Sequence, residues 1–593
     1  MTGVALLAAA VLLAAPASAL DAVRHVFTGA GDGVTARLEA ASLLREAQAN
    51  EVDDPQELLA AAKAEYGRMV AVLYGEGFYG GVVSVRVDGR EAADFDPLEV
   101  PRAIREIVVS VNTGPRFRFG RAEVAPLAPD TELPEGFAPE RIARSDLIRD
   151  ATRAAVDGWR DAGHAKAEPG EQRITADHRR EELDARIAIR TGPEVTFGRL
   201  RVQGTERMRE RRVHKIAGLP EGERFDPAAV AQAAQRLRRT GSFASVALSE
   251  ADTLGPGDTL DITATLIEAP LRRIGFGAEL DTEDGLRLSA FWLHRNLLGG
   301  AERLRVEGEL GGIGSRIGGR EYRFATRYER PATLTPDTTL NIGITAETVT
   351  ERDYDARQFG VELGLSHIFS ERLTGEIGIG YFFERVIDAG GRTDRAALLL
   401  PTSLRYDARD DDRDATRGYL LEGSVTPFLG LQGGASGGRI ALDARGYLPA
   451  GERLVLAGRV QLGSVVGAAL DDTPRQFLFL SGGGGTVRGQ PFRSLGVERV
   501  IGGDTVLVGG RGFAGISGEA RVGVTDSIGV VAFADAGLVS ASSFFSGGRW
   551  HAGAGLGLRY ATGIGPIRVD LGAPVRGATG SGLQLYVGIG QAF

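Results

Sequence analysis

The segment that decides the fold is Leu583-Gln-Leu-Tyr-Val-Gly-Ile-Gly-Gln-Ala-Phe593, in which two kinds of side chain alternate. Its apolar positions share one face of an extended strand, interrupted only by Gln591: Leu583, Leu585, Val587, Ile589 and Phe593. The other face carries glutamine, tyrosine and glycine. A membrane-barrel strand turns apolar side chains to lipid and polar or small ones to the lumen. The segment therefore predicts a membrane-spanning strand with Phe593 on its lipid face.

The same pattern extends back through the second half of the chain. From Leu271 onward, apolar and polar residues alternate between breaks at Gly, Asp, Asn and Pro, and many of the 84 glycines lie here. Because no apolar run is long enough for a spanning helix, a membrane-embedded chain must be a closed barrel. At ~20 residues per strand with its turns, residues 270–593 predict a transmembrane antiparallel β-barrel of about sixteen strands. A soluble β-sandwich is the alternative.

The first half contains an internal repeat. Val111–Gly120, VNTGPRFRFG, matches Ile189–Gly198, IRTGPEVTFG, and Leu266–Pro270 is a weaker third copy. A second landmark recurs in parallel as Gly77-Phe-Tyr79, Gly163-His-Ala165 and Gly241-Ser-Phe243. Each unit predicts the order strand, helix, helix, strand, strand. We therefore expect three α+β modules, at residues 22–114, 115–192 and 193–269.

Helix-start signals support this division. Asp226 followed by Pro227 is an N-cap with proline at the first helical position, and Asp54-Pro55 begins the equivalent helix of the first unit. In the third unit the pattern predicts helices at Glu210–Ala217 and Ala228–Arg239. It predicts strands at Val195–Val202, Ala244–Ser249 and Leu260–Leu266.

The beginning of the sequence predicts a secretory signal peptide at residues 1–19. An uncharged apolar run, Val4–Ala15, is followed by Pro16 and by Ala17-Ser-Ala19, which resembles a cleavage site. The run is short of the ~20 residues that a membrane anchor needs. We therefore expect the mature chain in the bacterial outer membrane, with its N-terminal modules in the periplasm.

Bulk composition excludes several classes of function. A net charge of −9 argues against a nucleic-acid partner. The chain has no cysteine, which excludes disulfides and cysteine-bound zinc. Gly434-Ala-Ser-Gly-Gly438 fits the G-x-S-x-G pattern but lies in a glycine-rich stretch among predicted barrel strands, not between a strand and a helix. The scattered histidines and the acidic run near Asp410 show no metal-ligand or triad spacing. We predict no enzyme activity, no cofactor and no metal site.

The repeat and four barrel motifs resemble a known group. The Gly-Phe-Tyr and Thr-Gly-Pro landmarks resemble POTRA domains, the polypeptide-transport modules that precede outer-membrane assembly barrels. Four motifs in the second half resemble the superfamily that includes BamA and TamA: Val487-Arg488-Gly489-Gln490, Asp407-Ala-Arg409-Asp410 with Arg417-Gly418, Ser517-Gly-Glu519, and Phe533-Ala-Asp535-Ala-Gly537. Gln490 departs from the family, which usually has an aromatic residue there.

The resemblance implies that Arg488 lies on a loop folded into the barrel and pairs there with Glu519 or Asp535. Strand parity agrees, because a charge on the lipid face is costly and both carboxylates should therefore face the lumen. The planar guanidinium suits such bidentate pairing. The alternative is that these are ordinary charges lining a wet barrel.

Three modules before the barrel resemble the TamA family, which implies a role in protein assembly. The implied partners are unfolded outer-membrane β-barrel clients such as autotransporters, a TamB-like inner-membrane-anchored protein, and outer-membrane lipid. The family mechanism also implies a seam between the first and last strands, where glycines weaken pairing. The candidate seam residues are Gly275, Gly277, Gly588, Gly590 and Phe593, with lumen crowding as the alternative reason for the glycines. A two-partner-type secretion channel, a passive pore and a soluble periplasmic binding protein remain open.

Overall fold

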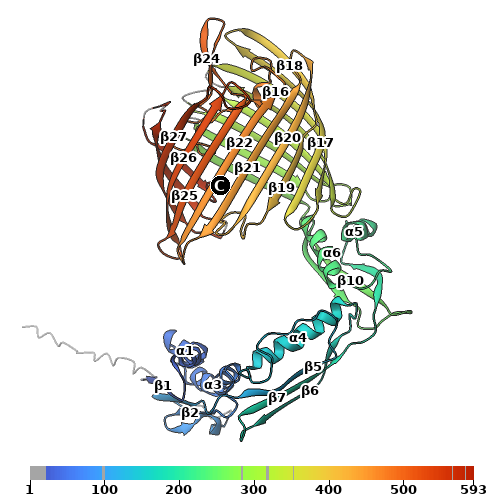
Figure 1. The fold of residues 1–593 in the computed structure, drawn as a ribbon, viewed down its shortest axis with the longest axis vertical. Helices are drawn as coiled ribbons and strands as arrows, with labels where there is room; N and C mark the ends of the chain where they lie inside the picture. The colour runs from blue at the N-terminus through green and yellow to red at the C-terminus, as the bar shows by residue number, and fades with distance from the viewer. Residues whose placement is uncertain are drawn as a thin grey trace, which may run out of the picture. The chain divides into compact units, whose positions relative to one another are not determined.

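The computed structural model describes residues 22–96, 101–281, 285–315, 319–350, 353–563, 565–577, 579–580 and 582–593 (Figure 1). The predicted signal peptide lies outside the described residues. The chain forms two compact units, one of residues up to Arg199 with 220–229 and 251–261, the other of residues 200–219, 230–250 and 262–593. Within the described ranges, no helix is long and apolar enough to cross a membrane.

The first module packs helices on a four-stranded sheet of order β1-β4-β2-β3. Its elements are β1 (Ala22–Thr28), α1 (Asp32–Ala41), α2 (Leu43–Ala49), α3 (Pro55–Gly75), β2 (Val82–Val87), β3 (Arg90–Glu91), a short 3-10 helix (Ala92–Asp94) and β4 (Glu106–Asn112). Helix α3 begins as predicted, because the Asp54 carboxylate accepts a hydrogen bond from the Gln56 amide at 3.2 Å. Leu58, Ala62 and Met69 on one face of α3 are fully buried in the module core.

The second module departs from the repeat pattern, because it has one helix where two are predicted. Its elements are β5 (Arg118–Ala125), α4 (Ser145–Asp161), β6 (Glu168–Asp177) and β7 (Glu182–Arg190), with sheet order β5-β7-β6. Residues 126–144, where the first helix was expected, form turns, bends and an isolated β-bridge at Ile142, with no helix. Four prolines occur there, at 126, 129, 134 and 139, and each lacks the backbone N–H that a helix interior requires.

The third module has the predicted order of elements. It contains β8 (Thr196–Gln203), α5 (Glu210–Ala217), α6 (Pro227–Arg239), β9 (Phe243–Glu250) and β10 (Thr259–Glu268), with sheet order β8-β10-β9. The Asp226 carboxylate accepts from the Ala228 amide at 2.8 Å and caps α6. Gly218, at φ +60°, ends α5 in the left-handed conformation that favours glycine.

One continuous antiparallel sheet forms the barrel of the second unit (Figure 1). Its strands run in chain order as β11 (Arg272–Asp281), β12 (Gly285–His294), β13 (Arg303–Ile313), β14 (Glu321–Arg330), β15 (Thr338–Thr350), β16 (Tyr354–Ile368), β17 (Leu373–Asp388), β18 (Gly391–Leu399), β19 (Thr402–Asp407), β20 (Gly418–Gln432), β21 (Gly437–Pro449), β22 (Leu454–Val466), β25 (Gly512–Gly523), β26 (Ile528–Ser540), β27 (Arg549–Tyr560), β28 (Ile567–Arg576) and β29 (Gln584–Ile589). We call the end at which β11 begins the proximal end and the opposite end the distal end.

The seventeen segments of this sheet correspond to sixteen barrel strands in the described chain. β18 and β19 each pair with both β17 and β20, so they are the two halves of one strand. The interruption falls at Leu400 and Pro401, and proline cannot donate to a strand ladder. The expected count of about sixteen strands is therefore met.

The side chains of the last strand alternate as predicted, but Phe593 does not lie where the sequence predicts. Leu585, Val587 and Ile589 are 43%, 53% and 62% exposed on the outer face. The chain leaves β29 at Gly590, whose φ is +89°, and Phe593 is buried against Ala415, Tyr447 and Ala457. The prediction that Phe593 faces lipid is therefore wrong, because the alternation ends where the strand ends.

The long segment between β22 and β25, residues 467–511, folds into the distal half of the barrel. We call it the inward loop. It carries a 3-10 turn (Arg475–Phe477) and a two-stranded hairpin of β23 (Val497–Ile501) and β24 (Asp504–Val508). Its buried side chains form one apolar core with the barrel wall: Phe477, Phe479, Val487 and Leu495 from the loop, and Phe382, Phe428, Val465 and Phe513 from the strands. This core therefore occupies part of the distal half of the lumen.

Helices α5 and α6 are bonded to the proximal turns of the barrel. The buried guanidinium of Arg212 donates to the carbonyls of Gly300 at 3.3 Å, Pro331 at 2.5 Å and Ala332 at 3.4 Å. Arg236 donates hydrogen bonds to both carboxylate oxygens of Asp337, and Arg239 donates a further hydrogen bond to this carboxylate at 2.8 Å. These bonds hold the helices against the β12–β13 and β14–β15 turns.

We expect Asp337→Asn to loosen this contact. Burial acts to raise the pKa of Asp337, but hydrogen bonds from Arg236 and Arg239 outweigh it and hold the pKa below its usual value. A carboxyl with a depressed folded pKa stabilises the contact above its unfolded pKa of ~3.9, and the contribution is lost as the pH falls through the folded value. At neutral pH the substitution should cost about 1–3 kcal/mol.

The measurement is the distance distribution between spin labels at Gln232 on α6 and Thr335 in the turn. It should broaden in Asp337→Asn at pH 7 and in the parent protein only under strongly acidic conditions. Asp526→Asn, an exposed acid in the β25–β26 turn, is the matched control. An unchanged distribution in Asp337→Asn would show that other contacts hold the helices.

Candidate functional site

The site is centred on Arg488, where the inward loop meets the barrel wall. Glycines on both sides permit the close approach of the two backbones. Gly489 has φ +89°, and a Cβ there would collide with the Ala573 carbonyl. A Cβ on Gly553, in the wall, would collide with the carbonyl of Arg488 itself. The loop can reach this depth only because both positions are glycine.

Three carboxylates surround the Arg488 guanidinium. Nε and Nη2 donate to the two oxygens of Asp535 at 2.8 and 3.0 Å, and the backbone amide of Arg488 adds a third bond at 3.0 Å. Nη1 donates to Glu519 at 2.6 Å and to Asp570 at 3.3 Å. The guanidinium carbon lies 3.7 Å from the centroid of the Phe533 ring. This is the bidentate geometry in which arginine–carboxylate pairs are strongest.

All of these charged groups are buried. Arg488, Glu519, Asp535 and Asp570 are each 4% exposed or less. Asp535 and Ser517 are direct partners across β25 and β26, and Glu519 lies opposite Phe533, so all come from the inner faces of neighbouring strands. The structure thus brings Arg488 together with both carboxylates that the sequence analysis named. Asp570 is a third partner that it did not name, although Arg568 and Asp570 alternate with apolar residues on one strand.

Further arginines balance the carboxylates. Arg521 donates to Glu519 at 2.8 Å, and Arg559 donates to Asp570 at 2.5 Å. Buried charges are tolerated when they are paired and hydrogen-bonded, as they are here. Strand parity places these side chains on the inner face, but the sequence does not show that they meet at one depth in the barrel.

The residues beside Arg488 fix the loop in other ways. Val487 is fully buried in the apolar core. The side chain of Gln490 donates to the carbonyls of Ala552 and Arg576, both at 3.1 Å, and its carbonyl oxygen accepts from the Thr579 amide at 3.2 Å. Gln490 therefore replaces the aromatic residue of the related motif with four side-chain hydrogen bonds, two to the distal ends of β27 and β28 and two to Thr579.

The hairpin motif forms the proximal turn between β19 and β20. Arg409 binds both oxygens of Asp407, at 2.9 and 2.8 Å. Burial acts to raise the pKa of Asp410, but bonds from the hydroxyl and amide of Thr416 and from the Arg417 amide lower it to about 2. Gly418, at φ +94°, lies against the Ala408 carbonyl, where a Cβ would collide. None of these residues contacts Arg488 in the described structure.

The first and last strands form the seam. β11 pairs with β12 over ten residues, and β29 pairs with β28 over six. Among the described residues, no ladder of hydrogen bonds joins β11 to β29. In the described part of the chain, β11 and β29 thus lie near each other, but each forms a ladder with one neighbouring strand.

The seam glycines have neighbours that account for them. A Cβ on Gly275 would collide with the Phe291 ring, and one on Gly277 would crowd the Ser289 hydroxyl, both across the β11–β12 ladder. Gly588 lies against the Arg568 guanidinium, and Gly590 occupies the turn at which the chain leaves β29. These contacts favour close packing inside the barrel as the reason for the glycines.

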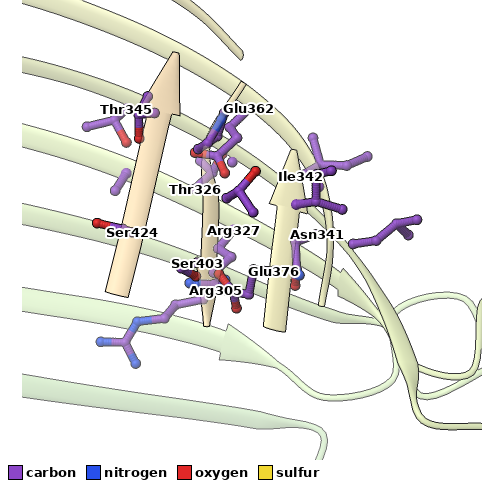
Figure 2. A pocket seen from close by; sticks show the side chains of 18 of the residues that line it. Arg305, Thr326, Arg327, Asn341, Ile342, Thr345, Glu362, Glu376, Ser403 and Ser424 are labelled. Carbon is purple, nitrogen blue, oxygen red and sulfur yellow. The ribbon is translucent and has the colours of Figure 1, made fainter. Parts of the chain in front are cut away.

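A polar cavity of about 510 Å³ lies on the inner face of the wall formed by β13–β17, β19 and β20. Figure 2 shows the charged and hydroxyl side chains that surround it, among them Arg305, Arg327, Glu362 and Glu376. Its residues are not those that hold Arg488. The described lumen thus has an apolar core in its distal half, a charged cluster on β25–β28 and a polar cavity on another part of the wall.

Comparison with known families identifies the architecture. The model of the Omp85 superfamily domain matches residues 296–593, which is half of the chain. The chain belongs to the Omp85 superfamily. A second model, the surface antigen variable number repeat, or POTRA, matches residues 195–268, which form the third module. This Omp85 protein is an outer-membrane protein with POTRA domains on the periplasmic side, so the proximal end of its barrel is the periplasmic end.

Individual relatives are similar but distant. The chain is 23% identical over 504 residues to the outer membrane protein assembly factor BamA of Nitratidesulfovibrio vulgaris, covering 79% of this chain and 61% of the relative, so it spans less than two thirds of that protein. BamA from Haemophilus ducreyi lacking POTRA domains 1–3 has a similar fold, with a TM-score of 0.64, 18% identity, and coverage of 80% of this chain and all of that one. CdiB from Acinetobacter baumannii aligns with a TM-score of 0.49 and 10% identity, covering 80% of this chain and 90% of that one.

Proposed function

We propose that this Omp85 protein folds client β-barrels into the outer membrane through the seam between β11 and β29, without covalent chemistry. The observation that carries the proposal is the absence of a described ladder between these two strands. A strand edge without a partner offers a row of N–H and C=O groups to another strand. A client strand that pairs there enters the membrane with its backbone already bonded.

The energetics favour such a template. An unpaired backbone group in lipid costs several kcal/mol, so a client strand cannot enter the membrane alone. Pairing with β11 or β29 removes that cost one strand at a time. The free energy for inserting the client then comes from the client's own folding, and no nucleotide or cofactor is needed.

The apolar core in the distal half of the lumen argues against a passive pore or an open secretion channel. The inward loop and the wall share one apolar core there, and Arg488 fixes the loop to β25, β26 and β28. Ions or an unfolded chain would have to displace that core. Planar-bilayer conductance of the intact protein should therefore be low and should rise when the inward loop is removed.

Three modules before the barrel support a TamA-like role within this function. On that proposal the clients include autotransporters, and the periplasmic modules contact a TamB-like partner anchored in the inner membrane. Affinity purification from crosslinked outer membranes should then recover a large periplasm-spanning protein. Deletion of the first module, residues 22–114, should reduce that recovery and leave the heat-sensitive gel mobility of the barrel unchanged.

The direct test of the proposed function is reconstitution. A urea-unfolded autotransporter barrel is diluted into liposomes that contain this protein, and its folding is followed by the gel mobility of unheated samples. We expect folding to be at least about tenfold faster than in liposomes that hold an equal mass of an ordinary porin. Equal rates in the two preparations would contradict the proposal.

A further inference from the structure

The last strand, β29, has a second attachment inside the barrel. Its only described ladder is with β28. From the middle of β29, the Tyr586 side chain turns inward to the loop. The Tyr586 hydroxyl accepts a hydrogen bond from the Gly489 amide at 3.1 Å and donates to the Gln490 carbonyl at 3.3 Å. These two residues directly follow Arg488.

The tail that follows β29 is attached to the same cluster. Arg559 donates to the Gln591 side chain at 2.7 Å, and Gln591 donates to Asp414 at 2.8 Å. Arg521 donates to the carbonyl of Phe593 at 3.1 Å, and its guanidinium lies 5.6 Å from the Phe593 ring centroid.

The two routes converge on Arg488. Arg521 is paired with Glu519, and Arg559 is paired with Asp570. Both of these carboxylates also bind the Arg488 guanidinium. The middle and the end of the last strand are therefore attached to groups that hold the inward loop in place.

We infer that the inward loop holds β29 at the seam, with Tyr586, Gln591 and Phe593 as the positioning residues. No described ladder joins β29 to β11, and the inward loop instead holds β29 through hydrogen bonds inside the barrel. Release of Arg488 then loosens β29, and coupling of this kind is reciprocal, so displacement of β29 by a client weakens the loop contact. The inference rests on the proposed function in assigning β29 to the client, but the coupling itself is a property of the barrel alone.

The test is amide hydrogen exchange of β29 in the full-length protein in lipid nanodiscs, with no client present. Tyr586→Phe keeps the ring and removes only the hydroxyl, so exchange in β29 should become roughly tenfold faster while β21 and β22 remain unchanged. Tyr560→Phe, on the outer face of β27, is the matched control and should have no effect. Gln591→Ala provides a second variant that tests the tail independently.

Coupling also predicts non-additivity. Arg488→Met should accelerate exchange in β29, and adding Tyr586→Phe to it should have little further effect, because the loop contact is already lost. Full additivity of the two changes, or unchanged exchange in Tyr586→Phe and in Gln591→Ala, would overturn the inference.

The two proposals fail in different ways. If the variants loosen β29 but client folding in liposomes stays at the porin background, the coupling stands and the proposed function falls. If exchange in β29 does not respond while the protein still accelerates client folding, the function stands and the coupling falls.

Discussion

Replacing Arg488 with methionine should destabilise the barrel by about 3–5 kcal/mol. The substitution removes the guanidinium that binds Glu519, Asp535 and Asp570 together, and it leaves the carboxylate of Asp535 buried without its two guanidinium bonds. An uncompensated buried charge is far more costly than the loss of an exposed pair. Unfolding of the protein by urea in lipid vesicles, followed by the unheated gel mobility of the barrel, measures the change.

Two further variants identify the cause. Arg499→Met removes an arginine from the same loop, but its pair with Asp471 is exposed, with side-chain exposures of 44% and 59%, so the cost should stay below about 1 kcal/mol. Arg488→Lys keeps the charge and loses the planar fork, and it should give an intermediate cost.

A double substitution completes the cycle. Arg488→Met with Asp535→Leu removes both sides of the closest pair and should cost less than the sum of the two single changes. Equal stability of Arg488→Met and Arg499→Met would show that the buried cluster contributes nothing particular to the barrel.

A disulfide across the seam should abolish client folding while leaving the barrel intact. One cysteine is placed in Ile274–Ala278 of β11 and one in Leu585–Ile589 of β29, at positions whose Cα atoms lie within about 7 Å. The chain has no native cysteine, so the introduced pair is unambiguous. We expect the oxidised protein to fold a client at the porin background rate and the reduced protein to recover the parent rate.

The control is a disulfide between two interior strands. Leu442 and Leu462 are direct partners across β21 and β22, so a bond there fixes a junction that the proposal leaves closed. This variant should support client folding in both redox states. A seam-oxidised protein that works at the normal rate would refute the seam mechanism and leave the activity to the periplasmic modules.

The sequence predicts the position of some residues of this site and not of others, because different physical rules determine where each side chain lies. Charges avoid lipid, so parity alone places Glu519 and Asp535 on the inner face, and the motif around Arg488 indicates their partner. Strand parity does not give the depth of a side chain in the barrel, and for that reason Asp570 and Tyr586 were not predicted at the site.

The predictions for Phe593 and for the second module are wrong, and each error has a local structural cause. Phe593 continues the apolar alternation in sequence, but the strand ends at Ile589 and the tail turns inward to bonds that only the folded barrel provides. The second module repeats its neighbours' landmarks, and the prolines in residues 126–144 override the repeat. By contrast, Glu210–Ala217 forms the helix that the sequence predicts with the same bounds, because its periodicity and the terminal Gly218 agree.

The contact between α6 and the β14–β15 turn has a mechanical consequence. Arg236 and Arg239 bond α6 to Asp337, and Arg212 bonds α5 to the β12–β13 and β14–β15 turns. The two residues just before β11 are also bonded to the β12–β13 turn, since Arg295 donates to the carbonyls of Leu271 and Pro270. A force on these helices therefore acts on the first strands of the barrel through these hydrogen bonds, whereas β29 is bonded to β28 and to the inward loop. The two strands that flank the seam are thus held by different parts of the chain, β11 at the proximal turns and β29 by β28 and the inward loop.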